Sequence, residues 1–434
     1  MAIERTNTTS YVHPQETNLL NIHKSMEYNS LGQPILRVTT SSGQGTTAGI
    51  DAFGRAQVAH PFTLFDSQHR YAENDRFWTS TVNGATTAHD ADASLMNMNV
   101  STTSGSKAIM ESRKVFPYQP GKALEIFATF TMAPAQTNLR QRIGYFGSEN
   151  GVFIEKDGDT VYMVLRSSSS GSIVETRVAQ EDWNIDKADG TGFSMVNLDF
   201  DKSQIFFTDI EWLGVGTVRT GFVVNGAFIV VHKFHHANSI TGTYMTTAAL
   251  PVRYEIEATG ALSAPATLKH ICSTVVSSGG YSLSGKSYTA GRGLSYYTAS
   301  TAGTYYHLVS IRLKATNLDD IVIPNMINVL TNSNQNLQYE LVTGATFATP
   351  LVWTDDNATQ YSITDSVVSD LGTELLTGYI VNKGEAGQFT PEQLYELQLQ
   401  RANGTATVLS LIATADNNNT TMTGNMGWFQ PLRG

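Results

Sequence analysis

The stretch from residue 143 to residue 238 constrains the fold more than any other part of the chain. Apolar and polar residues alternate there over short runs, and clusters of Gly, Asn, Asp or Ser close each run. This pattern is typical of antiparallel strands, because successive side chains on a strand point to opposite faces. Strands that recur at intervals of about 8–12 residues belong to β-sandwiches and jelly rolls.

The composition agrees with an all-β fold. Charged residues make up only 15% of the 434-residue chain, while Thr, Ser, Asn and Gly are abundant and aromatic residues reach 10%. Such a mixture favours strands and tight turns over helices. We therefore expect an antiparallel β-sandwich of the jelly-roll or concanavalin-like kind, with an extended N-terminal arm and additional C-terminal β-structure.

The charge balance and the cysteine content exclude several classes of function. Lys and Arg number 28 against 38 Asp and Glu, a net charge of −10, and no basic run is present, so we expect no nucleic-acid partner. No apolar segment has the length of a signal peptide or a membrane span, so we expect no membrane insertion. Cys272 is the only cysteine, which rules out an intrachain disulfide and fits assembly in a reducing cytoplasm.

Shifts in composition divide the chain into four regions. The first is polar and lacks the apolar clusters of a core, so it is either disordered or laid along a partner; we favour an arm that docks. The last holds further alternating segments, which form either a closing sheet of the same body or a small second β-domain. The regions are a docking arm at 1–60, a connector at 61–110, the sandwich body at 111–320 and a β-rich region at 321–434.

Aromatic and apolar side chains in the first two regions suggest a docking surface. Aromatic residues interleaved with Asp and Arg suit a partly buried interface, although an irregular cap over the sandwich explains them equally well. The predicted interface residues are Ile35, Leu36, Phe53, Phe62, Phe65, Tyr71, Phe77 and Trp78.

The segment 390–403, TPEQLYELQLQRAN, is the best helical candidate. Thr390 can cap a helix, and Pro391 fits the first helical position because its missing N–H is not needed there. Leu397 and Leu399 also alternate as in a strand, so the sequence leaves helix and strand equally open.

One pair of acidic residues suggests catalysis. Asp209 and Glu211 lie two positions apart on a predicted strand, so both carboxylates share one face. Glycoside hydrolases use two carboxylates in this way, as acid and as nucleophile or base. The jelly-roll enzymes normally have a third acid two positions earlier, where this chain has Phe207. We therefore favour a solvated or hydrogen-bonded strand face.

Two patterns suggest a metal ion, but each has a simpler explanation. His232 and His236 share a strand face, yet no nearby Cys completes a zinc ligand set. The acidic loops at 157–160 and 186–192 offer oxygen ligands for calcium, but turns use Asp and Gly for their backbone geometry alone. We predict no metal and no cofactor.

Tyrosines in Gly- and Ser-rich sequence after residue 280 are a candidate contact surface. Exposed tyrosines stack on sugar rings and also dominate protein interfaces, while ordinary packing is the alternative. The residues chosen for a glycan or subunit contact are Tyr288, Tyr296, Tyr297, Tyr305 and Tyr306.

Three stretches together resemble a group of tailed-phage virion structural proteins of the fibre, decoration or baseplate-associated type. They are GIDAFGRAQVAHPFTLFDSQHRY, DIEWLGVGTVRTGFVVNG and HICSTVVSSGG, and the resemblance extends over about residues 31–434. It implies a lectin-like sandwich, often in a trimer. It carries no catalytic motif.

These observations predict a non-enzymatic structural component of a tailed-phage particle, assembled in the host cytoplasm and located in the virion. We expect its partners to be other virion proteins and further copies of the chain in a trimer. A host-glycan-binding adhesin is the alternative, and behind it stands a polysaccharide depolymerase that uses Asp209 and Glu211. The adhesin would add a host surface glycan to the partners.

Overall fold

The computed structural model describes residues 61–73, 77–280, 285–318, 320–381 and 405–431, together with four short strands. It divides into two units, Met1–Ala59 and His60–Gly434. The described part of the first unit is an antiparallel hairpin of β1 (Met26–Tyr28) and β2 (Pro34–Leu36). Ile35 and Leu36 lie on β2, whereas Phe53 lies outside the described residues.

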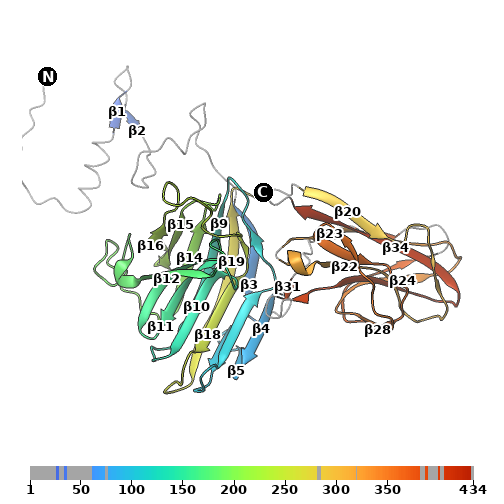
Figure 1. Cartoon of the computed structure of the whole chain (residues 1–434), viewed down its shortest axis with the longest axis horizontal. Coiled ribbons are helices and arrows are strands. Elements are labelled where there is room, and N and C mark those ends of the chain that lie inside the picture. The colour runs from blue at the N-terminus through green and yellow to red at the C-terminus, as the bar shows by residue number, and fades with distance from the viewer. Residues whose placement is uncertain are drawn as a thin grey trace, which may run out of the picture. The chain divides into compact units, whose positions relative to one another are not determined.

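A seven-stranded antiparallel sheet forms one layer of the second unit (Figure 1), in the order β13-β12-β11-β10-β18-β7-β4. Short turns join β10, β11 and β12, whereas β18 comes from much later in the chain. The strands are β4 (Trp78–Asn83), β7 (Lys107–Ser112), β10 (Leu139–Phe146), β11 (Gly151–Asp157), β12 (Thr160–Ser167), β13 (Val174–Ala179) and β18 (Val252–Ala258).

An eight-stranded sheet packs against it, in the order β16-β15-β14-β9-β19-β6-β5, with β3 also paired to β19. Its strands are β3 (Pro61–Gln68), β5 (Ala85–Asp90), β6 (Leu95–Val100), β9 (Ala123–Thr131), β14 (Gln204–Ile210), β15 (Val218–Val224), β16 (Ala227–Phe234) and β19 (Ala266–Ser278). Two short strands, β8 (Phe116–Pro117) and β17 (Ala249–Leu250), pair beside them, and η2 (Gln180–Asp182) is a single 3₁₀ turn.

The core of this sandwich lies between the two sheets, because alternate residues of each strand point inward. Ile126 and Phe206 come from one sheet and Ile143 and Met163 from the other, and all four are almost fully buried. The prediction of an all-β antiparallel sandwich is thus confirmed. The sequence suggested a connector at residues 61–110. The strands that begin in this region, β3 to β7, all belong to the two large sheets.

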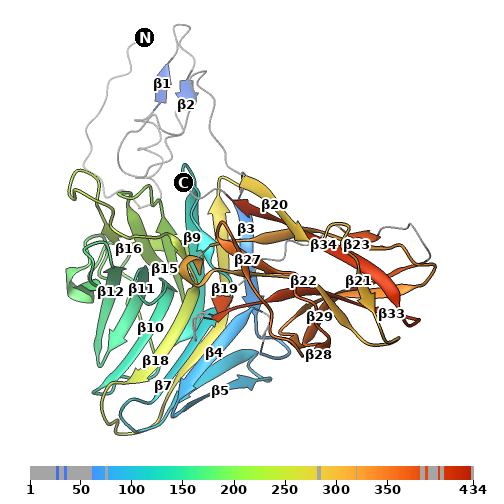
Figure 2. The same ribbon diagram turned by 45° about the vertical axis from the view of Figure 1, so that its right-hand side comes forward.

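The C-terminal residues form a second pair of sheets with a separate core (Figure 2). Leu308, Val329, Leu411 and Trp428 are fully buried in that core. One sheet contains β20 (Gly285–Gly291), β21 (Tyr297–Ala299), β23 (Ile323–Thr331), β30 (Gly387–Phe389) and β34 (Thr420–Pro431). The other contains β22 (Tyr306–Leu313), β24 (Leu337–Thr343), β26 (Thr354–Asp356), β27 (Thr359–Ser362), β29 (Thr373–Ile380) and β33 (Leu409–Ala415).

Smaller elements complete the C-terminal part. They are the pair β25 (Thr346–Phe347) and β28 (Val368–Asp370), the pair β31 (Leu399–Gln400) and β32 (Thr405–Ala406), and the 3₁₀ turn η3 (Ala315–Asn317). The helix-or-strand segment 390–403 lies outside the described residues except at β31. Within the described ranges, no helix has the length and apolar character needed to cross a membrane.

Candidate functional site

The outward face of the seven-stranded sheet carries a dense array of charged side chains, which we call the charged face. Its residues occupy the alternate positions of β7, β10, β11, β12, β13 and β18 that point away from the core. Acidic and basic residues are equal in number. The charged face consists of Lys107, Glu111, Arg140, Arg142, Glu155, Asp157, Arg166, Glu175, Arg177, Arg253, Glu255 and Glu257.

The strand register makes the signs of the charges alternate across the sheet. Glu255 of β18 lies opposite Arg142 of β10, which in turn lies opposite Glu155 of β11. Directly opposite residues on neighbouring strands are close enough for their side chains to interact. Opposite charges therefore lie side by side in a row that runs across the strands. No carboxylate of the charged face lies directly opposite another on a neighbouring strand.

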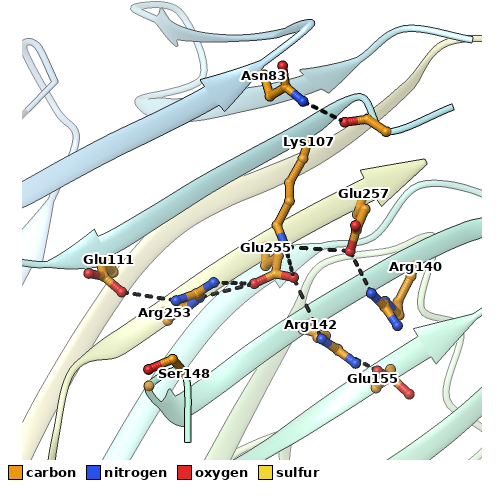
Figure 3. A network of polar contacts seen from close by, with 12 residues as sticks. Asn83, Lys107, Glu111, Arg140, Arg142, Ser148, Glu155, Arg253, Glu255 and Glu257 are labelled. Carbon is orange, nitrogen blue, oxygen red and sulfur yellow. Dashed lines mark hydrogen bonds and ion pairs between the residues drawn. The ribbon is translucent and has the colours of Figure 1, made fainter. Parts of the chain in front are cut away.

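Glu255 lies at the centre of the array (Figure 3). Its Oε2 accepts hydrogen bonds from Nη2 and Nε of Arg253 at 2.5 and 3.1 Å, and its Oε1 lies 2.9 Å from Nζ of Lys107 and 3.7 Å from Nη1 of Arg142. Burial opposes the ionisation of Glu255, but these cations outweigh it and hold its pKa at about 2. Glu255 is therefore a permanent carboxylate at neutral pH.

Two further carboxylates extend the array toward the edge of the sheet. The fully buried Glu155 lies 2.5 Å from Nε of Arg142 and 2.5 Å from Nη2 of Arg177. Oε1 of Glu175 accepts two hydrogen bonds from Arg166, from Nε at 2.9 Å and from Nη2 at 2.6 Å. Such forked contacts fix the planes of the guanidinium groups.

An aromatic pair lies beneath the arginines. The rings of Phe146 and Phe153 are 4.4 Å apart between centroids, and both are fully buried. The guanidinium carbons of Arg142, Arg166 and Arg253 lie 5.0 to 5.5 Å from the centres of these rings. The cations are thus held from below by the rings as well as from the side by carboxylates.

A glycine on the neighbouring strand makes room for this pair. Gly144 of β10 lies opposite Phe153 of β11, and a Cβ at Gly144 would come within 2.7 Å of the Phe153 Cα. Any larger residue would push the two strands apart, so the aromatic layer requires glycine at this position.

The charged face offers fixed hydrogen-bond donors beside fixed acceptors. Guanidinium groups only donate and ionised carboxylates only accept, so a ligand hydroxyl, which does both, can bind between them. In the part of the chain that the structure describes, no group of three or more His, Cys, Asp or Glu side chains is placed to hold a metal ion.

The structure places Asp209 and Glu211 elsewhere, on the eight-stranded sheet. Asp209 is buried on β14, and its Oδ2 accepts hydrogen bonds from Nε of Arg219, at 2.7 Å, and from Nη2. Glu211 lies one residue beyond the end of β14 and is exposed. The two carboxylates therefore have different surroundings, and Asp209 already serves an ion pair.

The histidines and the acidic loop have structural partners. Nδ1 of His232 accepts a hydrogen bond from the backbone N–H of Asn184 at 3.3 Å, and burial lowers its pKa to about 4. The ring of His236 stacks on Tyr244 at 3.9 Å between centroids. Asp186 accepts backbone N–H groups with both carboxylate oxygens, at 2.8 and 2.7 Å, as in a turn.

The predicted docking aromatics divide into two groups. Phe65 and Trp78 are buried in the sandwich core, where their rings meet at 5.7 Å, so they are not free to bind a partner. Phe62, Tyr71 and Phe77 are exposed by 47%, 82% and 39%.

The predicted tyrosine surface is largely part of the C-terminal packing. Tyr306 is buried, and Tyr297 lies against it at 5.1 Å between ring centroids. Tyr288 stacks on the buried Trp428, and the Tyr305 hydroxyl donates to Oε1 of Glu340. Tyr296 is partly exposed.

Sequence reasoning missed the charged face, although a signal for it was present. The run VRYEIEA alternates strictly, and every residue in its outward phase is charged: Arg253, Glu255 and Glu257. Arg140 and Arg142 in LRQRIGYF repeat the pattern. When the alternate positions that point away from the core carry charges of both signs, they indicate a sheet face that makes polar contacts.

Comparison with known proteins yields similarity of fold alone. No protein-family profile matches the sequence, and no curated protein is similar to it. Among solved structures, a Bacillus licheniformis β-glucanase matches with a TM-score of 0.32 and 10% identity, over 48% of this chain and 97% of that one. A carbohydrate esterase from Shiga toxin-encoding bacteriophage phi24B matches with a TM-score of 0.28 and 12% identity, over 51% and 100%.

A legume lectin-like domain from Entamoeba histolytica matches over 48% of this chain and 95% of that one, with a TM-score of 0.30 and 10% identity. These likenesses agree with the lectin-like sandwich. None of the three is a virion structural protein by its description, so the resemblance to that group stays a prediction.

The prediction of a non-enzymatic protein is corrected by the same comparisons. The matched structures include a glucanase and an esterase, so enzymes share this fold. The absence of a catalytic motif in the sequence was the basis for that prediction, but one fold can host enzymes as well as proteins without catalytic activity.

Proposed function

We propose that this chain is a glycan-binding component of a tailed-phage particle and that the glycan binds on the charged face of the sandwich. The resemblance of three sequence stretches to virion structural proteins supports the phage setting. The side chains of the charged face support the glycan.

One observation carries the proposal: carboxylates and guanidinium groups are concentrated and nearly buried on the outward side of a sheet. Glu155 and Glu255 are 0% and 2% exposed. Burying ion pairs costs desolvation energy, and apolar residues of similar size often stabilise a protein as well or better. A sheet face that needed only to be stable would not require this array, so we assign it to recognition.

The chemistry of the array fits a polyhydroxylated ligand. Donors and acceptors alternate in the rows of side chains that run across the strands. Each hydroxyl of a bound sugar would therefore contact a guanidinium on one side and a carboxylate on the other. The more exposed members have 20 to 37% of their side-chain surface open to solvent, and they are Lys107, Arg140, Asp157, Glu175, Arg177 and Glu257. They are the first residues that a ligand would contact.

The test is binding of the purified full chain to an array of bacterial surface polysaccharides, followed by titration of the best ligand. Two variants, Arg140→Lys and Arg253→Lys, keep the charge and remove the forked donor. We expect each to weaken binding by about tenfold, since one hydrogen bond to a charged group contributes about 1.5 kcal/mol. Arg312→Lys, in the C-terminal sandwich, is the matched control and should bind as the parent does.

Two results would contradict the proposal. The first is the lack of any bound polysaccharide. The second is binding that both variants leave unchanged, which would place the ligand on another surface. Release of reducing ends during the titration should be measured in the same samples, because release that both variants abolish would identify the charged face as an active site.

The phage setting needs its own measurement. Antibody against the C-terminal sandwich should label intact particles at one structure, and quantitative mass spectrometry of purified particles should give its copy number. Absence of the chain from purified particles would contradict the virion assignment and leave the glycan proposal standing.

A further inference from the structure

Three phenylalanines cluster on the outward side of the eight-stranded sheet, away from the charged face; Phe228 is exposed, Phe127 partly exposed and Phe207 buried beneath them. The rings of Phe127, Phe207 and Phe228 contact one another, with centroids 5.3 to 6.4 Å apart. They come from β9, β14 and β16, the strands at one end of that sheet (Figure 1). We call this surface the aromatic face.

The aromatic face is open to solvent. Phe228 is 63% exposed and the neighbouring Ile205 is 40% exposed. Phe207 leans over Gly221 of β15, where a Cβ would come within 2.8 Å of the Phe207 ring. Adjacent aromatic and aliphatic side chains on a flat sheet face are typical of the centre of a protein interface.

A rank of four charged residues borders the aromatic face. Glu125 of β9 lies opposite Asp209 of β14, Asp209 lies opposite Arg219 of β15, and Arg219 lies opposite Lys233 of β16. The signs along this rank run negative, negative, positive, positive. Oδ1 of Asp209 is buried and has no hydrogen-bond partner, although Oδ2 binds Arg219. The rank therefore keeps an unused acceptor beside the aromatic cluster.

We propose that the aromatic face binds a second copy of this chain through a two-fold axis parallel to the strands, between β14 and β15. A rotation about that axis reverses the order of the rank. Glu125 of one chain then faces Lys233 of the other, and Asp209 faces Arg219. The reversed order has the opposite charge at every position, so the rank of one chain pairs with the rank of a second copy.

The same rotation matches the apolar groups. Phe127 lies opposite Phe207, Phe207 opposite Gly221 and Gly221 opposite Val230, so the rotation sets Phe127 of one chain against Val230 of the other and Phe207 against Gly221. An isologous interface of this kind closes as a dimer, because each chain uses the same surface. A partner of different sequence would not require a rank of this symmetry, which is why we assign the face to a second copy.

A charge-exchange experiment tests this assignment in the full chain. Lys233→Glu places acid opposite Glu125, and Glu125→Lys places base opposite Lys233, so each variant alone should dissociate at least about tenfold more readily than the parent dimer. Mixing the two variants restores opposite charges at both contacts. We expect the mixture to form a heterodimer with an affinity near that of the parent.

Sedimentation velocity over a range of protein concentrations measures all four samples, and Lys286→Glu in the C-terminal sandwich serves as a control that should dimerise as the parent does. Phe228→Asp, at an exposed position, should give a folded monomer. A parent chain that stays monomeric or forms a trimer through this face, or a mixture that fails to associate, would overturn the proposal. Glycan binding on the opposite sheet is measured separately, so either proposal can fail alone.

Discussion

At the scale of single residues, burial decides which side chains keep their ordinary chemistry. His69 and His270 lie in the sandwich core with Nε2 of the first 3.3 Å from Nδ1 of the second. The rings of Trp78 and Tyr254 pack against His270 at 4.4 and 3.8 Å between centroids. The hydrogen bond between the imidazoles needs one of them to accept, so at least the accepting ring must be neutral.

The histidine pair predicts a loss of stability in acid. Burial, with a smaller repulsion from His89, lowers the pKa of His69 to about 4, whereas an unfolded histidine has a pKa of about 6.5. Between those values the unfolded chain binds a proton that the folded chain does not, so the free energy of unfolding falls as the pH falls. His69 alone should account for about 2 kcal/mol between pH 6.5 and 5.

Urea unfolding across that pH range checks the prediction. His69→Gln should flatten the loss by a similar amount, even if it is less stable than the parent at neutral pH. His235→Gln, at an exposed position, should leave the pH dependence as it is. A His69→Gln curve parallel to that of the parent would show that the pair does not titrate with unfolding.

At the scale of elements, the seven-stranded sheet joins strands that are distant in sequence through its charged face. Glu255 of β18 binds Lys107 of β7 on one side and Arg142 of β10 on the other. Removing its charge takes one carboxylate from each of Lys107, Arg142 and Arg253 in a layer that is largely shielded from water. The sheet therefore depends on this carboxylate more than on any exposed ion pair.

We expect Glu255→Gln to lower the free energy of unfolding by about 3–5 kcal/mol, the usual cost of breaking a buried pair from one side. Lys202→Gln, which removes the exposed ion pair of Lys202 with Asp199, should change it by less than about 1 kcal/mol. Chemical denaturation of both variants measures the contrast. If both variants lowered the free energy of unfolding by the same amount, the ion pairs of Glu255 would be as accessible to water as an exposed pair.

At the scale of the whole molecule, the second unit contains two large hydrophobic cores that share no residue, and a small cluster of Val115, Ala249, Ile321 and Ile323 connects the two sandwiches. The N-terminal sandwich encloses Phe206, and the C-terminal sheets enclose Trp428. The sequence left open whether the C-terminal strands close the first sandwich or form a domain. Their separate core favours a domain that begins at β20, before the predicted boundary at residue 321.

Two core variants test this division. Phe206→Ala and Trp428→Ala each leave a cavity, at a cost of about 3–5 kcal/mol. We expect calorimetry to show two transitions, with Phe206→Ala lowering one melting temperature and Trp428→Ala the other. A single transition that both variants shift together would show that the two cores unfold as one cooperative unit.

The sequence by itself determined the fold class. The alternation that places Phe206 and Phe222 on one side of their strands is local, so it can be recognised before any pairing is known. It also predicted one strand through Asp209 and Glu211, whereas β14 ends at Ile210 and leaves Glu211 outside it. Aromatic residues interleaved with Asp and Arg suggested an interface at Phe65 and Trp78, but both side chains are buried in the core, because such a pattern does not say which face of a strand is covered.

Only the tertiary structure decided which residues meet. Lys107, Arg142 and Glu255 lie far apart in the chain, and they form one array because β18 enters the sheet between β7 and β10. The self-complementary rank from Glu125 to Lys233 likewise depends on the register of β9, β14, β15 and β16. Local side-chain patterns determine that strands form, whereas strand order and register are set by packing over the whole sheet, and these place the charges.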